Sequence, residues 1–246
     1  MVLGMLGGFL TPILLSTGQD APLGLFSYIA LLDVVIIAVA LHCRWNYLLP
    51  LAALGTVVME LGWLAHYFAA GSYDVGWRTL VPFSVLSGFY ALWLWVVARA
   101  MRLNPRDAWA SGAALSLGAI AFLTAFYFSR FAGVDGRPWL LFGFVFVLDL
   151  LTLGVARRDA KVQWAYTVSG GVVFLFLSIW MGSRSTEELL AAALTYTLVF
   201  ALAHTVLPIW LGRRDGRATL PPDATLFPPV ALVVLLIPIF RVVALT

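Results

Sequence analysis

The residues of this sequence that could do chemistry are a few ionisable side chains inside long apolar stretches. Asp33, Glu60 and Asp149 lie near the centres of such stretches, and His204 lies within another. A charged carboxylate at the centre of a transmembrane helix costs roughly 2.5–3.5 kcal/mol on insertion scales. We therefore expect each carboxyl group to face the interior of a helix bundle, where it is paired, reached by water or protonated.

Two different roles fit the depth of these residues in a membrane. Depth is measured from the end of each helix that is expected to face the cytoplasm. At 1.5 Å per residue, Asp33 lies roughly 15 Å from that end, Asp149 and His204 roughly 12 Å, and Glu60 nearer 20 Å. Carboxylates and an imidazole that share one depth could form a proton or cation path. Alternatively, each Asp accepts a hydrogen bond from a Ser, Thr, Tyr or Trp on a neighbouring helix and holds the bundle in register.

Sequence motifs for other chemistry are absent. The sequence has no His-Glu-x-x-His, no Gly-x-Ser-x-Gly and no P-loop. Neither Asp33 nor Asp149 stands in the Gly-x-Gly-Asp setting that intramembrane aspartyl proteases use. The single cysteine, Cys43, excludes an internal disulfide and a multi-cysteine metal site. We therefore predict no catalytic residue, no metal and no cofactor, and we favour a protein without enzymatic activity.

The elements that hold these residues are predicted to be membrane-spanning helices. Apolar residues make up 62% of the chain and charged residues only 11%, against roughly 25% charged in a soluble domain. This composition excludes a soluble domain, a disordered chain and the usual kind of nucleic-acid binder. The apolar runs are too long for barrel strands and lack alternation of period two. We expect an all-α transmembrane helix bundle whose main partner is the lipid bilayer.

Eight apolar stretches reach the length of about 20 residues that crosses a bilayer. No loop between them is long enough to hold a soluble domain, so we expect one integral membrane domain over 1–246. The eight predicted spans are 22–43, 46–70, 78–101, 108–129, 138–156, 162–182, 188–211 and 227–245. A short ninth span is expected at the N-terminus, over 1–16.

The basic residues predict the orientation. Ten of the fifteen lie in alternate loops around Arg44, Arg102, Arg158 and Arg214, and four lie in the opposite loops. Cytoplasmic loops are enriched in basic residues, so these four loops are expected to be cytoplasmic. The loops near residues 74, 134 and 185 and the C-terminus are then expected outside.

The segment around Asp33 recurs 116 residues later. Leu25-Phe26, Leu32-Asp33 and Val39-Ala40 reappear as Leu141-Phe142, Leu148-Asp149 and Val155-Ala156. The recurrence favours two parallel four-helix repeats over 20–129 and 136–226, followed by the final span 227–245. Chance matches are common in apolar sequence, so an undivided bundle remains open.

Small residues indicate where helices could approach closely. Gly170-Gly171 is one such pair, and small residues let helix backbones pack tightly in membranes. The neighbouring helix could belong to the same chain, to another membrane protein or to a second copy in a homo-oligomer. The pattern names no partner.

The N-terminal part resembles the DUF2339 family of predicted bacterial multi-pass membrane proteins. The resemblance starts with Leu-Gly-Gly-Phe-Leu-Thr-Pro-Ile-Leu-Leu-Ser-Thr-Gly at 6–18 and continues through Leu25-Phe26-Ser27-Tyr28, Arg44-Trp45 and Leu54-Gly55-Thr56. It implies a bacterial inner-membrane protein and supplies no catalytic residues. Family members are usually much longer, so we expect this chain to be a fragment or a short member.

Three functions are left by these observations. The favoured one is a structural or assembly-type membrane bundle without chemistry of its own. The second is a transporter or channel with a path through Asp33, Asp149 and His204, and the third is an enzyme acting on a lipid-linked substrate. A water-wide cavity at those residues would favour transport, and a dry bundle would favour the structural role. An enzyme would need a polar cleft with convergent ionisable groups.

Overall fold

A computed structural model describes residues 2–15, 18–68, 71, 73, 76–103, 108–135, 137–156, 163–184, 187–214 and 222–245. Those residues form helices and short connections, with no strand among them. The predicted all-α class is therefore confirmed for the described part of the chain. Its helices gather into two compact units, Met1–Arg137 (unit 1) and Pro138–Thr246 (unit 2).

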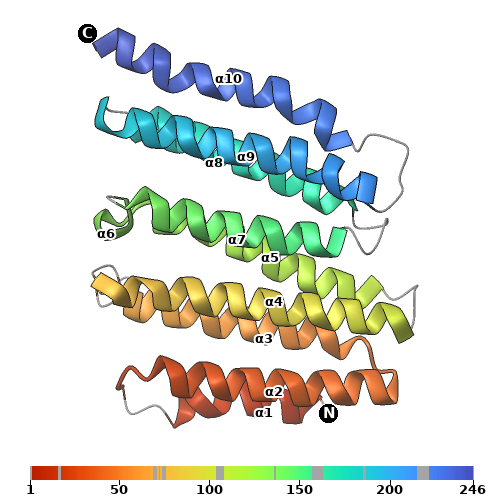
Figure 1. Cartoon of the computed structure of the whole chain (residues 1–246). Coiled ribbons are helices and arrows are strands. Elements are labelled where there is room, and N and C mark those ends of the chain that lie inside the picture. Colours follow the sequence, from red (N-terminus) through yellow and green to blue (C-terminus); the bar gives the residue numbers. More distant parts are fainter. Residues whose placement is uncertain are drawn as a thin grey trace. The chain divides into compact units, whose positions relative to one another are not determined.

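Unit 1 is built around α3, which packs against α1, α2 and α5. Helix α4 packs against α2 and α5, so the unit has a closed interior between its long helices. Its elements (Figure 1) are α1 (Val2–Leu14), α2 (Pro22–Cys43), α3 (Leu48–Trp63), η1 (Leu64–Phe68), η2 (Gly76–Thr79), α4 (Leu80–Leu103), α5 (Ala108–Phe128) and α6 (Ala132–Asp135).

Unit 2 is built around α8, which packs against α7, α9 and α10. Helix α10 also packs along α9. The four helices (Figure 1) are α7 (Pro138–Ala156), α8 (Gln163–Arg184), α9 (Glu187–Arg214) and α10 (Pro222–Leu245). The sequence repeat over 20–129 and 136–226 stays a prediction.

Local chemistry explains where α2 begins and ends. Pro22 occupies the first turn, where its missing N–H would have had no helical partner. At the other end Arg44 adopts a left-handed backbone with φ of 59°. The N–H of Trp45 then bonds the carbonyl of Ala40 at 2.9 Å, which closes the helix in the usual C-terminal manner.

Five helical stretches among the described residues are long and apolar enough to cross a membrane. They are Pro22–Cys43, Leu48–Phe68, Gly76–Ala100, Trp164–Ser183 and Ala191–Arg214. Shorter apolar helices cover Val2–Leu14, Gly112–Phe128, Pro138–Gly154 and Leu226–Ile237. Each of these stretches overlaps one predicted span, while the number of spans stays a prediction.

One predicted span differs from a regular helix. The stretch expected over 46–70 is an α-helix only to Trp63 and continues as a π-helix from Leu64 to Phe68. Such a wide turn leaves no signal in apolar periodicity. At the end of this π-helix, Phe68 is fully buried and packs edge-on against Phe131, with ring centroids 4.7 Å apart.

Candidate functional site

Three helices of unit 2 meet at a buried group of polar side chains. The Oδ2 atom of Asp149 on α7 lies 3.0 Å from Nε2 of His204 on α9. The hydroxyl of Ser169 on α8 donates a hydrogen bond to Asp149 Oδ1 at 2.6 Å. Asp149 and His204 are both 0% exposed. Their contact has the distance of an ion pair but not the alignment of a hydrogen bond.

The imidazole of His204 is enclosed by aromatic rings. It stacks on Tyr166 with a centroid distance of 4.5 Å and lies 4.8 Å from Phe227. The Tyr166 hydroxyl donates to the carbonyl of Ala203 at 3.0 Å, which ties α8 to α9. A Cβ atom at Gly170 would lie 2.7 Å from His204 Nδ1. The absent side chain at Gly170 therefore makes room for the imidazole.

Unit 1 has its own buried polar group. The hydroxyl of Thr56 on α3 donates to Oδ2 of Asp33 on α2 at 2.7 Å. Glu60, one helical turn after Thr56, lies close enough to Asp33 to interact with its charge. The indole N–H of Trp93 on α4 also approaches Asp33, without the geometry of a hydrogen bond. Asp33 is 0% exposed and Glu60 2%.

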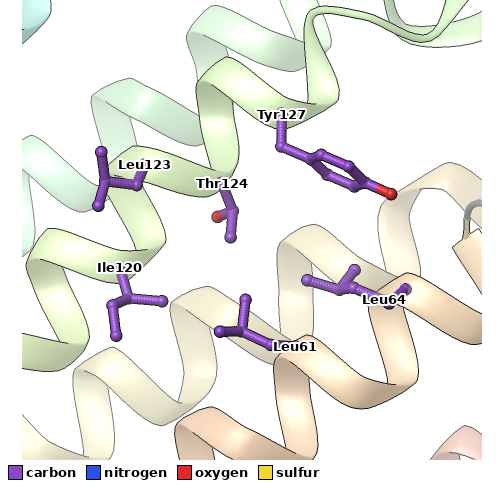
Figure 2. A pocket seen from close by; sticks show the side chains of 7 residues that line it. Leu61, Leu64, Ile120, Leu123, Thr124 and Tyr127 are labelled. Atoms are coloured by element: carbon purple, nitrogen blue, oxygen red, sulfur yellow. The ribbon is translucent and has the colours of Figure 1, made fainter.

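A groove of about 390 Å³ lies in unit 1 between α3–η1 and α5. Figure 2 shows Leu61 and Leu64 on one side and Ile120, Leu123, Thr124 and Tyr127 on the other. The only polar side chains in the lining are Thr124 and Tyr127, and neither Asp33 nor Glu60 belongs to it. This groove therefore offers an apolar surface and does not bring water to the carboxyl groups.

A family model described as "Predicted membrane protein (DUF2339)" matches residues 1–135. The chain belongs to the DUF2339 family. It is accordingly a membrane protein, and the resemblance noted over residues 6–56 extends through almost all of unit 1. No curated protein and no solved structure matches the chain.

The DUF2339 match includes Asp33 and Glu60 but ends before Asp149 and His204. The structure brings Asp149 and His204 together, as their shared depth suggests, and it brings Asp33 and Glu60 together in unit 1. Burial of both aspartates, each with a partner on a neighbouring helix, is confirmed. That these four residues form one functional site stays a prediction.

A polar cluster at the C-terminal end of α3 in this DUF2339 chain was not predicted. Asp20, which precedes α2, accepts a hydrogen bond at Oδ1 from the indole of Trp63 at 3.0 Å. Its second carboxylate oxygen accepts a bond from the hydroxyl of Tyr73. The three residues are far apart in the sequence, and no motif marks them. Burial raises the pKa of Tyr73, and the hydrogen bond to Asp20 adds to the rise.

We expect the DUF2339 protein to lose stability above pH 10 through Tyr73. Its pKa is higher in the folded chain than the usual value of 10.0. The resulting stabilisation is fully present below pH 10 and is lost as the pH rises through the folded pKa. Thermal unfolding of the parent and Tyr73→Phe across this range should show the parent's advantage shrinking. Trp63→Phe removes the other hydrogen bond but no phenol, so its cost should stay constant. An advantage over Tyr73→Phe that stays undiminished as the pH rises above 10 would contradict the expectation.

Proposed function

We propose that this protein is a structural or assembly-type membrane bundle, in which buried polar contacts fix the register of neighbouring helices. The observation that carries the proposal is that these polar contacts are buried away from water. Asp33, Asp149 and His204 are each 0% exposed, so a water-sized probe reaches none of them. Each Asp accepts a hydrogen bond from a hydroxyl on the next helix of its unit. Such interhelical hydrogen bonds hold membrane helices together.

The proposal includes the membrane arrangement derived from the sequence. Eight spans and a short ninth cross the bacterial inner membrane, with the loops around Arg44, Arg102, Arg158 and Arg214 in the cytoplasm. Arg44 and Arg214 are exposed in the structure. Arg158, positions 74 and 185, the C-terminal Thr246 and the side chain of Arg102 lie outside the described residues.

A proton or cation path is the second candidate function. One observation favours it, because Asp33 and Glu60 lie together in unit 1 and the only charge acting on Glu60 among the described residues is another negative one. The enzyme alternative gains nothing from the groove, whose lining has no acid or imidazole. We therefore keep transport, and not catalysis, as the runner-up.

Asparagine substitutions separate the structural role from transport. Asn keeps the shape and hydrogen-bonding capacity of Asp but cannot ionise. We expect Asp33→Asn and Asp149→Asn to fold, with a loss of at most about 1–2 kcal/mol in unfolding free energy. In liposomes that contain a pH-sensitive dye, the parent and both variants should show the proton leak of empty liposomes. A parental flux under any gradient would contradict a purely structural role, and its loss in either variant would assign the path to that residue.

A further inference from the structure

The two units contain the same contact between an aspartate and a hydroxyl, but the third side chain beside the aspartate differs. In each, an Asp accepts a hydrogen bond from a hydroxyl on the following helix, Asp33 from Thr56 and Asp149 from Ser169. In unit 2 the third side chain of the group is His204, whose Nε2 lies 3.0 Å from Asp149 Oδ2. In unit 1 the third member is Glu60, which cannot supply a positive charge.

In the described part of unit 1, no side chain around the carboxyl pair of Asp33 and Glu60 supplies a cation. Helix α1 has no ionisable residue, and the described cations of the neighbouring elements are exposed and not among the groups that act on Glu60 or Asp33. Among the described side chains, Thr56 and Trp93 approach Asp33 as donors, and Asp33 is the charged group that lies near Glu60. Besides Asp33, the titratable or basic side chains described on α2, η1, η2, α4 and α5 are Tyr28, His42, Cys43, His66, Tyr67, Arg78, Tyr90, Arg99 and Tyr127.

The two carboxyl groups are not equivalent. Asp33 accepts the bond from Thr56 at Oδ2 and faces the indole N–H of Trp93, so donors support its negative charge. The Oε1 atom of Glu60 and the Oδ1 atom of Asp33 are both buried without a hydrogen-bond partner. Among the described residues, however, Asp33 has a hydroxyl donor in Thr56 and Glu60 has none. A buried charge without a partner is far more costly than a neutral acid. A carboxylic acid, unlike a carboxylate, also has an O–H that it can donate.

We propose that Glu60 is a proton-binding site at the centre of unit 1 and holds its proton at neutral pH beside the Asp33 carboxylate. One O–H bond forms on a Glu60 oxygen while one O–H bond of a hydronium ion breaks and leaves a water molecule, and no other covalent bond changes. A proton fits because the pair is packed so closely that a water-sized probe does not touch Asp33 and barely touches Glu60. The site is independent of the proposed structural role, and each can fail without the other.

Isotope-edited infrared spectroscopy tests the proposal on the full chain. The sequence has three glutamates, Glu60, Glu187 and Glu188. In a Glu187→Gln/Glu188→Gln background, glutamate labelled with ¹³C at its side-chain carboxyl therefore reports on Glu60 alone. In a detergent without ester groups at neutral pH, we expect the carbonyl band of a neutral carboxylic acid to shift with the label. A labelled group that absorbs only as a carboxylate would overturn the proposal.

Two controls complete the test. Glu60→Gln resembles the protonated acid, so it should fold with the parent's stability and lose the neutral-acid band. Asp149→Asn, the matched change in unit 2, should leave that band in place. Loss of the band in Asp149→Asn, or its persistence in Glu60→Gln, would overturn the assignment to Glu60. Disappearance of the band on adding sodium but not choline at constant pH would also overturn it, in favour of a metal cation.

Discussion

Replacing His204 with leucine is expected to lower the free energy of unfolding by about 3–5 kcal/mol, because it leaves the buried Asp149 carboxyl group without the imidazole that pairs with it. Asp149 is 0% exposed, and His204 is its only partner that can supply a positive charge among the described residues. After the change, only the hydrogen bond from Ser169 would support the carboxylate. Unfolding in mixed micelles, followed by tertiary circular dichroism, measures the loss.

The double variant Asp149→Leu/His204→Leu is the control that separates charge from packing. Apolar residues in place of a whole buried ion pair are often neutral or stabilising. Ser169 would keep a partner, because its hydroxyl also donates to the carbonyl of Tyr166 at 2.9 Å. We therefore expect the double variant to regain most of the stability lost in His204→Leu. Losses that simply add would show that the two residues do not act as a pair.

The Asp149–His204 pair also shows how far the sequence could lead. An ionisable residue inside an apolar stretch is conspicuous, so Asp149 and His204 could both be predicted as buried and at one depth. The partner hydroxyls could not be chosen in advance. In a membrane helix, the side that faces lipid is as apolar as the side that faces the core. Without an amphipathic pattern, nothing in the sequence singles out Ser169 or Thr56 from the other hydroxyls.

Helix bounds were predictable where loops interrupt the apolar runs. Prolines start both α2 and α7, and their observed ranges, Pro22–Cys43 and Pro138–Ala156, agree with the predicted ones. A helix extends beyond its predicted membrane span where hydrophobicity and helical structure diverge. Helix α10 begins at Pro222 and not at 227, because its first turn is polar but still helical. The cluster of Asp20, Trp63 and Tyr73 depends on tertiary contact alone.

Two adjacent glycines of α8 should respond in opposite ways to the same substitution. A Cβ atom at Gly170 would lie 2.5 Å from Phe227 Cζ and 2.7 Å from the His204 ring, closer than real Cβ contacts. Both rings are buried, so neither can move away freely. At Gly171, which is exposed, an added Cβ would meet nothing within 4 Å.

Gly170→Ala is therefore expected to cost about 1–3 kcal/mol through overpacking, while Gly171→Ala should be neutral or gain up to about 1 kcal/mol from helix propensity. Unfolding of the two variants in the same micelles gives the comparison directly, because both gain one methyl group on one helix. A displaced imidazole would also move away from Asp149, so the cost of Gly170→Ala should shrink when Asp149 and His204 are both leucine. Equal effects at the two positions would mean that Gly170 does not face α9 and α10. Asp149 and His204 could then meet only if the helices were rotated differently about their axes.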